Sequence, residues 1–249
     1  MTELTIVMPV YNEGERIYRN LIETVTQVEK FSDSFRIIAV NDGSSDESKQ
    51  EIERAVAADK RIGLISYDKN TGKGYAVRRG ILNSKSEYTA FLDADLEIPP
   101  YLLEGMLEKA KENDAEIVIG SKMHKESKVE YPFFRRVLSY GYYVYMKMLF
   151  GLKVKDTQTG IKLFRTEKIR PVLKVMKTGR FSFDIEILAI STRLGYKIEE
   201  MPVVVNFSRN KNNRSTIRIK SIAEMICDSI KIKMHLAKAE REVKNGSFR

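Results

Sequence analysis

The sequence contains a single cysteine, no tryptophan, no repeat or low-complexity tract, and no long hydrophobic run. One cysteine, Cys227, excludes an internal disulfide framework and is typical of a reducing compartment. No stretch reaches the ~18–20 apolar residues of a membrane-spanning helix, and the longest candidate, 140–152, is interrupted by Lys147. The first residues lead into a strand pattern and lack the features of a signal peptide. We therefore expect a globular cytoplasmic protein that is not integral to a membrane.

Acidic and basic residues are unevenly distributed along the 249 residues, whose net charge is +9. Residues 1–119 carry 15 basic and 22 acidic side chains, whereas residues 120–249 carry 28 and 12. A strongly basic half favours an anionic partner, such as a membrane surface, a nucleic acid or an acidic substrate. The alternative is a solvated lysine-rich surface of the kind found in thermophilic proteins. Because the charge is localised, we favour the anionic partner.

Strand and helix patterns alternate through the first 120 residues. Strands are expected at 4–10, 35–40, 62–67, 89–92 and 115–120, and helices at 14–30, 45–58, 74–82 and 99–113. Ser45 is expected to cap the second helix, and Pro99 and Pro100 suit the first turn of the fourth. This alternation predicts an α/β fold with a mainly parallel central sheet flanked by helices on both faces.

The second half is less regular. Its expected helices are 132–152, which is rich in aromatic residues, 183–194, and an amphipathic closing helix at 216–243 with a frayed tail. Strands are expected at 161–164 and 197–207, a polar loop at 156–160 and a basic loop at 208–215.

Two carboxylates, Asp93 and Asp95, directly follow the buried strand pattern at 89–92. Charged groups are costly inside a core, so these side chains must lie where the strand ends, which is where open α/β sheets bind ligands. Side chains two residues apart on an extended chain point the same way and can converge on one cation. Mg²⁺ or Mn²⁺ suits such oxygen ligands and keeps positions open for substrate phosphates. An isolated Asp-x-Asp is more often a solvated turn, so the neighbouring loops decide the interpretation.

Polar loops also follow the first two expected strands. The first loop contains Pro9, Tyr11, Asn12 and Glu13, and the second contains Asp42 and Ser44. Tyr11 can lie against a nucleobase, and Asn12 or Glu13 can bond the base or ribose edge. Asp42 can accept a hydrogen bond from an imide N–H, which uracil has and cytosine lacks. Each loop taken alone is an ordinary turn, but together they indicate a nucleotide site.

The loop after the third strand, 70–74, contains two glycines around Lys73. The glycines let the backbone approach a phosphate, and Lys73 adds a positive charge. This loop matches neither a Walker loop nor a dinucleotide fingerprint, which argues against a kinase, an ATPase or a dehydrogenase.

As an ordered set, segments 9–13, 41–46, 70–74 and 93–95 resemble the signature of family-2 glycosyltransferases. The resemblance covers about the first 120 residues. It implies a GT-A nucleotide-diphospho-sugar transferase fold, a nucleotide-sugar donor, and Mg²⁺ or Mn²⁺ held by Asp93 and Asp95.

Segments 156–164 and 181–188 resemble the dolichyl-phosphate glucose synthase branch, and more broadly the polyprenyl-phosphate glycosyltransferases. This resemblance implies an inverting, metal-dependent transfer of a hexose, with glucose expected, from a UDP-sugar to a polyprenyl or dolichyl phosphate. Dolichyl-phosphate mannose synthases share much of the pattern, so the sugar stays open. The expected domain is 1–215, with a nucleotide-sugar-binding part at 1–120 and an acceptor-side part at 121–215, followed by the closing helix and tail at 216–249.

The resemblance also implies roles for single residues. The expected catalytic residues are Asp95, Asp156 and Asp184. The expected binding residues are Pro9, Tyr11, Asn12, Glu13, Asp42, Ser44, Lys73, Asp93, Lys122 and Gln158. Asp156, Gln158 and Asp184 are expected around the sugar, and the candidates for holding the acceptor phosphate are Lys122, Arg135, Arg136, Arg209 and Lys211.

The chain departs from these relatives in three respects. Many of them carry spanning helices, which are not found here. Lys122 stands where they often have an arginine, and lysine lacks the bidentate fork of arginine. The basic loop before Ser215 matches their Arg-x-x-Ser-Lys pattern only loosely.

Two other functions fit the residues. A soluble family-2 transferase could add a sugar to a hydroxyl of a polysaccharide, glycolipid or protein, and would need Asp184 or Asp156 as general base. A basic nucleic-acid or membrane-binding module would not need Asp93 and Asp95 at all. A nucleotidylyltransferase is disfavoured because its glycine-rich N-terminal phosphate loop is missing from 1–20.

Segments 132–152 and 216–243 indicate which partners this protein binds. An aromatic-rich segment and a basic amphipathic helix predict peripheral contact with an anionic membrane surface, at its cytoplasmic face. The alternative is that these segments pack on each other or on a second copy, as a homo-oligomer. We expect no nucleic-acid partner.

Overall fold

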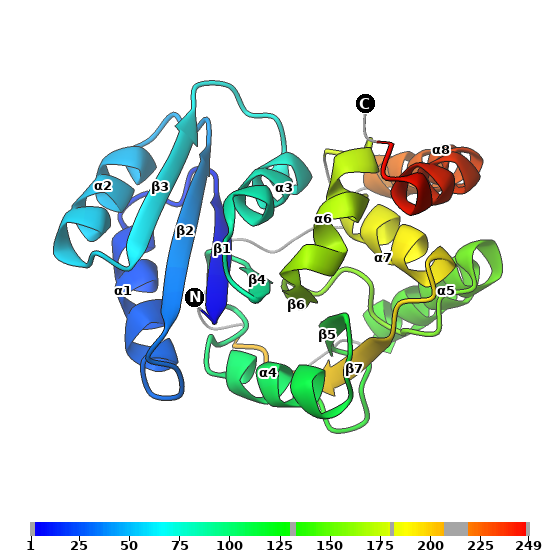
Figure 1. The fold of residues 1–249 in the computed structure, drawn as a ribbon, viewed down its shortest axis with the longest axis horizontal. Coiled ribbons are helices and arrows are strands. Elements are labelled where there is room, and N and C mark those ends of the chain that lie inside the picture. The colour runs from blue at the N-terminus through cyan, green and yellow to red at the C-terminus, as the bar shows by residue number, and fades with distance from the viewer. Residues whose placement is uncertain (1–2, 130–132, 180–181, 207–218, 248–249) are drawn as a thin grey trace.

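A computed structural model describes residues 3–129, 133–179, 182–206 and 219–247 of the chain (Figure 1). The predicted basic loop at 208–215, with Arg209 and Lys211, lies outside the described residues. None of the described helices combines the length and the apolar character needed to cross a bilayer.

The first half of the chain alternates strands and helices as its pattern predicts. The strands are β1 (Leu4–Val10), β2 (Phe35–Asp42), β3 (Ile62–Tyr67), β4 (Tyr88–Leu92) and β5 (Ile117–Ser121). The helices are α1 (Arg16–Val28), α2 (Ser48–Ala58), α3 (Lys73–Asn83) and α4 (Leu102–Glu112). Strands β3, β2, β1 and β4 pair in parallel, so their carboxyl ends meet at one sheet edge.

The second half adds α5 (Phe133–Phe150), β6 (Ile161–Arg165), α6 (Thr166–Val175), α7 (Phe183–Arg193), β7 (Ile198–Pro202) and α8 (Ile219–Asn245). Its strands join the same seven-stranded sheet, in the order β3-β2-β1-β4-β6-β5-β7. Strand β6 is antiparallel to both β4 and β5, whereas β5 and β7 are parallel. The expected α/β fold with a mainly parallel sheet flanked by helices is thus confirmed.

Helices cover both faces of the sheet. On one face α1, α2 and α4 bury residues such as Leu21, Ile52 and Met106. On the other face α3, α6, α7 and α8 form a second core, and Figure 1 shows α5, α6, α7 and α8 gathered at one end of the molecule. Burial of the apolar strands between these two layers stabilises the sheet and holds its carboxyl edge in place.

Two local predictions were wrong. Ser45 does not cap α2, because its N–H donates to Asn12 Oδ1, while Asp46 Oδ1 accepts from Ser48 N and the helix begins at Ser48. The strand expected at 197–207 ends at Pro202, and beyond it Val204 makes only an isolated bridge to Lys128.

One helix, α6, is absent from the sequence-based prediction. Its apolar residues Ile169, Val172 and Leu173 have helical spacing and are buried, so a signal was present. Pro171 lies inside this helix and obscured that signal.

Candidate active site

The carboxyl ends of β1, β2 and β4 and the start of α3 surround a cavity of about 350 Å³. Its lining residues are Pro9, Val10, Tyr11, Glu13, Asp42, Asn70, Gly72, Lys73, Asp93, Ala94 and Asp95. We call this the donor cavity. The structure therefore brings together most of the predicted residues of the four strand-end loops, because the parallel strands end side by side.

Asp93 is fixed by contacts on both sides of its carboxylate. Lys73 Nζ lies 2.6 Å from Asp93 Oδ1, and Asp93 N donates to the carbonyl of Gly160 at 2.9 Å. A Cβ atom at Gly160 would come within 2.2 Å of Asp93 Oδ2, so only glycine fits there without displacing the carboxylate. Burial by itself lowers the pKa of Lys73, but the charges of Asp93 and Asp184 outweigh it and raise this pKa above its ordinary value.

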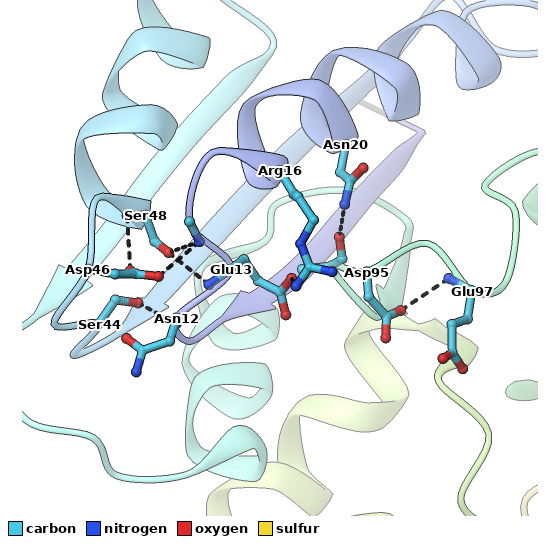
Figure 2. Close-up of polar contacts among 11 residues, drawn as sticks. Asn12, Glu13, Arg16, Asn20, Ser44, Asp46, Ser48, Asp95 and Glu97 are labelled. Atoms are coloured by element: carbon cyan, nitrogen blue, oxygen red, sulfur yellow. Dashed lines mark hydrogen bonds and ion pairs between the residues drawn. The ribbon is translucent and has the colours of Figure 1, made fainter. Parts of the chain in front are cut away.

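Asp95 lies in a concentration of negative charge. Burial and the charge of Asp93 raise the pKa of Asp95 to about 6. Burial also raises the pKa of Glu13, and the charges of Asp95 and Asp93 add to this effect against that of Arg16. Figure 2 shows Glu13, paired with Arg16, beside the loop that carries Asp95. Such a group of carboxylates attracts a cation.

The loop that carries Asp95 is held by α1 and by a hydrogen bond within the loop itself. Asn20 of α1 donates from Nδ2 to the carbonyl of Ala94 at 2.8 Å, and Asp95 Oδ1 accepts from Glu97 N at 3.1 Å (Figure 2). These bonds keep the Asp-Ala-Asp turn at the cavity wall.

The residues present suit a divalent cation that is shared with a substrate. Among the described residues, no group of three or more histidine, cysteine or acidic side chains is arranged to hold a metal unaided. Mg²⁺ is commonly bound by one or two carboxylates, with substrate phosphates and water completing its octahedron. Asp93 and Asp95, with their mutual repulsion, fit this mode.

Asp42 holds the third loop. Its Oδ1 accepts from Thr71 N and Thr71 Oγ1 at 2.8 and 2.9 Å, and its Oδ2 accepts from Gly72 N at 2.9 Å. The glycine-containing loop is thereby anchored to the end of β2, and Lys73 starts α3 directly beside it.

Asn12 and Ser44 lie beside the donor cavity and connect its first two loops. Asn12 N donates to Ser44 Oγ at 3.1 Å (Figure 2). Asn12 Oδ1 accepts from Ser45 N at 2.9 Å. Their observed contacts are therefore between loops, and neither residue is among those lining the cavity.

A second cavity, of about 620 Å³, contains three more of the predicted residues, Lys122, Asp156 and Gln158. It is lined by Lys122, Met123, His124, Lys125, Ser127, Val129, Tyr140, Tyr142, Lys155, Asp156, Thr157 and Gln158. We call this the basic cavity. Asp156 Oδ2 accepts from Lys122 N at 2.9 Å, and its Oδ1 accepts from Gln158 N at 3.2 Å. The loop 156–160 runs from this cavity to Gly160, which touches Asp93 at the donor cavity.

Asp184 is buried, with only 5% of its surface exposed, and does not line either cavity. Its Oδ1 lies 2.7 Å from Nζ of Lys162, a fully buried lysine that also donates to the carbonyl of Thr159 at 2.6 Å. Burial and the charge of Asp93 raise the pKa of Asp184, whereas Lys162 and Lys73 lower it, and the net shift is upward. The ammonium groups of Lys73 and Lys162 both lie over the ring of Phe91, at 5.0 and 5.5 Å from its centroid.

Lys162 and Glu186 were missed as site residues. A lysine within the apolar strand β6 was the available signal for the first. Glu186, which is buried in α7, accepts hydrogen bonds from Lys177 N, Thr178 N and Thr178 Oγ1. The segment that it holds reaches the donor side, because the carbonyl of Gly179 accepts from Tyr75 N in the first turn of α3.

Comparisons with known proteins agree with this geometry. The family model described as Glycosyl transferase family 2 matches residues 5–173. A dolichyl-phosphate beta-glucosyltransferase of Dictyostelium discoideum is 32% identical over 213 residues, which are 80% of this chain and 65% of the relative. A protein of the same name from Trichomonas vaginalis is 32% identical over 238 residues, covering 92% of this chain and 72% of the relative. The chain thus spans about two thirds to three quarters of the length of these relatives.

Solved structures share the fold at low sequence identity. Glucosyl-3-phosphoglycerate synthase from Mycobacterium tuberculosis, in complex with Mn²⁺, UDP and glucosyl-3-phosphoglycerate, aligns with a TM-score of 0.65 at 14% identity. The alignment covers 93% of this chain and 78% of that one. A mannosyltransferase from Pyrobaculum calidifontis, in complex with GDP-mannose and Mn²⁺, aligns with a TM-score of 0.63 at 16% identity over 97% of this chain and 69% of that one. The family match, the curated relatives and the GT-A fold together establish that the chain belongs to glycosyl transferase family 2.

Proposed function

We propose that this glycosyltransferase transfers glucose from UDP-glucose to a polyprenyl or dolichyl phosphate, with inversion at the anomeric carbon. The names of the curated relatives support glucose and dolichyl phosphate. The observation that carries the proposal is the connection of two unlike cavities, one rich in carboxylates and one rich in lysines, by the single loop 156–160.

The donor cavity suits a uridine diphosphate. Tyr11, which is 49% exposed, can lie flat against the base. A carboxylate has about four lone-pair positions. Asp42 accepts three hydrogen bonds from Thr71 and Gly72, which leaves at most one position for a uracil imide N–H. The amino end of α3 and Lys73 then face the diphosphate, since helix N-termini favour anions.

Asp93 and Asp95 would hold Mg²⁺ or Mn²⁺. When bound, the cation supplies Lewis-acid stabilisation of the leaving diphosphate. Lys73 already neutralises Asp93 and can turn its ammonium group to a donor phosphate, since its side chain is partly exposed. Gly160 and Asn20 hold the two carboxylates in position for this role.

The basic cavity suits the acceptor phosphate. Lys122, Lys125 and Lys155 supply ammonium groups, and His124 lies among them. The acceptor is already an anion at neutral pH, so it needs positioning more than it needs a strong base. Asp156 orders this cavity through its bonds to Lys122 and Gln158, and we assign the buried Asp184 a positioning role through Lys162.

The test is a donor screen with Mn²⁺ or Mg²⁺, with and without a short polyprenyl phosphate. We expect UDP release from UDP-glucose that depends on the lipid and is lost in Asp95→Asn. Asp33→Asn, an exposed position before β2, is the matched control and should keep full activity.

Each other outcome changes the proposal in a defined way. UDP-sugar binding without turnover on the lipid phosphate would favour a hydroxyl acceptor, with Asp156 in the basic cavity as general base. Turnover that survives in Asp95→Asn would contradict the metal role. Failure to bind any UDP-sugar would overturn the assignment of the donor.

A further inference from the structure

Helices α5 and α8 expose large apolar side chains along their outer sides. Within the described part of the chain these residues are Tyr140, Val144 and Met148 on α5 and Ile226, Ile230 and Met234 on α8. We call them the apolar face. Residues four apart lie on one side of a helix, so each set of three forms a continuous stripe. The exposure is large, at 82% for Met148 and 74% for Met234.

The two stripes lie on helices that contact each other. Tyr145 Oη and Ser229 Oγ are 2.8 Å apart, and Lys233 Nζ donates to the carbonyl of Leu149. Figure 1 shows both helices at the same end of the molecule.

These helices are also apolar on their inner sides, where residues such as Phe150 and Leu236 are buried in the core. The exposed stripes are therefore not needed for the core, and contiguous apolar patches of this kind mark interaction sites.

Basic side chains flank the apolar face. Lys147 lies next to Met148 on α5. Lys231 and Lys238 lie along α8 and are mostly exposed, although each is also near an acidic side chain, Asp228 at 3.5 Å and Glu242 at 3.7 Å. An apolar stripe with flanking lysines complements the surface of an anionic bilayer, whose acyl boundary accepts the apolar groups and whose headgroups attract the lysines. A two-fold contact between copies would place two lysine-flanked faces of like charge against each other, which opposes the contact.

The apolar face continues into the basic cavity. Tyr140 belongs to the α5 stripe and also lines that cavity beside Lys122, Lys125 and Lys155. A lipid phosphate has an anionic head and an apolar tail. The basic cavity offers a site for the head, and the adjoining apolar face offers a site for the tail.

We propose that the apolar face of α5 and α8 docks on an anionic lipid bilayer and opens the basic cavity to lipid phosphates held in that bilayer. The docking of the face rests on its own exposure and charge, whereas the entry of the acceptor rests on the proposed function above.

The experiment is flotation of the full chain with vesicles of phosphatidylcholine, with and without phosphatidylglycerol. We expect flotation with the anionic vesicles, weakened by salt. The combined variant Met148→Ser, Ile230→Ser and Met234→Ser should lose about tenfold or more in vesicle partitioning, because three apolar groups no longer enter the lipid. Tyr101→Ser, at an exposed aromatic residue at the start of α4, is the matched control and should float like the unmodified chain.

Light scattering on the same samples shows whether a second copy of the chain, and not a bilayer, covers the apolar face. A chain that ignores vesicles and forms a dimer that the triple variant dissociates would overturn the proposal in favour of a second copy. A monomer that ignores vesicles would overturn it outright.

Turnover with two acceptors separates this proposal from the proposed function. The triple variant should glucosylate a short, water-dispersed polyprenyl phosphate normally but lose turnover on the same lipid embedded in vesicles. If the unmodified chain uses neither acceptor yet floats through the apolar face, the docking holds and the proposed function fails. Equal loss with both acceptors would show that the face acts in catalysis or folding and not in docking.

Discussion

At the scale of single residues, two close contacts hold side chains of the site in position. The ion pair of Lys162 and Asp184 lies beneath Phe91, and Gly160 fits closely against the carboxylate of Asp93. The ion pair is shielded from solvent, whereas the Asp93 carboxylate lines the donor cavity and its side chain is 31% exposed. Both contacts position the groups that line the cavities, and each can be tested by one substitution with a matched control.

Lys162→Met should destabilise the fold strongly. The change leaves the Asp184 carboxylate buried without its cation, and breaking a buried pair in this way costs about 3–5 kcal/mol. Urea unfolding followed by circular dichroism measures the loss. Lys153→Met, at an exposed lysine, should change the free energy of unfolding by less than about 0.5 kcal/mol. Adding Asp184→Leu to Lys162→Met should recover part of the loss, and an additive double variant would contradict the pairing.

Gly160→Ala should impair the donor site while keeping the fold. The new Cβ meets the Asp93 carboxylate, and a shift of about 1 Å in a positioning group can cost about a hundredfold in rate. Steady-state turnover and Mn²⁺ binding measure the effect. Gly141→Ala is the control, since no atom lies within 4 Å of its added Cβ. Unchanged Mn²⁺ binding in Gly160→Ala would show that Asp93 is not held by this contact.

At the scale of elements, α7 is connected to the start of α3, which borders the donor cavity. Its buried Glu186 holds the segment 177–179, and that segment meets the first turn of α3 through Gly179 and Tyr75. The amino end of α3 is thus secured from two directions, by Asp42 of β2 and by α7. We therefore expect substitutions in α7 to weaken donor binding more than acceptor binding.

Glu186→Gln should raise the KM for the UDP-sugar more than it lowers kcat. Lys177 N donates to both carboxylate oxygens and Thr178 donates to one of them, so the NH2 group of the amide would face a backbone N–H and weaken this anchor at a cost of about 1–3 kcal/mol. Steady-state kinetics with varied donor and varied acceptor separates the two effects. Glu53→Gln, at an exposed glutamate of α2, should leave both constants unchanged. An effect on the acceptor KM alone would contradict the link to α3.

At the scale of the whole molecule, one sheet carries both cavities. Strand β6 runs antiparallel between β4 and β5, so the loop that precedes it, 156–160, returns to the edge where β4 ends in Asp93. The donor cavity and the basic cavity are therefore joined through the sheet topology, although their residues are distant in the sequence.

Binding of UDP with Mn²⁺ should raise the melting temperature of the whole chain. A ligand at about a hundred times its Kd adds about 2.7 kcal/mol to stability, which is about 5–10 °C for a domain of this size. Differential scanning fluorimetry measures the shift, and a chelator should remove it. Asp95→Asn should show no Mn²⁺-dependent shift, and an undiminished shift in that variant would contradict the assigned ligand.

Much of this protein was determined by local sequence. The alternation of strands and helices, the turn after β4 and the polar loops at the strand ends follow from hydrophobic periodicity and turn chemistry, which act over a few residues. The family resemblance added the expectation that Asp93 and Asp95 bind a metal ion, because their spacing by itself left this role open.

The tertiary structure decided the rest. It divided the predicted site residues between two cavities, assigned Asn12 and Ser44 to contacts between loops, and buried Asp184 against Lys162. It also revealed the roles of Gly160 and Glu186, which act on partners far away in the chain. The physical reason is that burial, charge pairing and steric fit depend on which segments meet across the sheet. A pattern of neighbouring residues carries periodicity, whereas the partner of a buried charge is set only when the chain has folded.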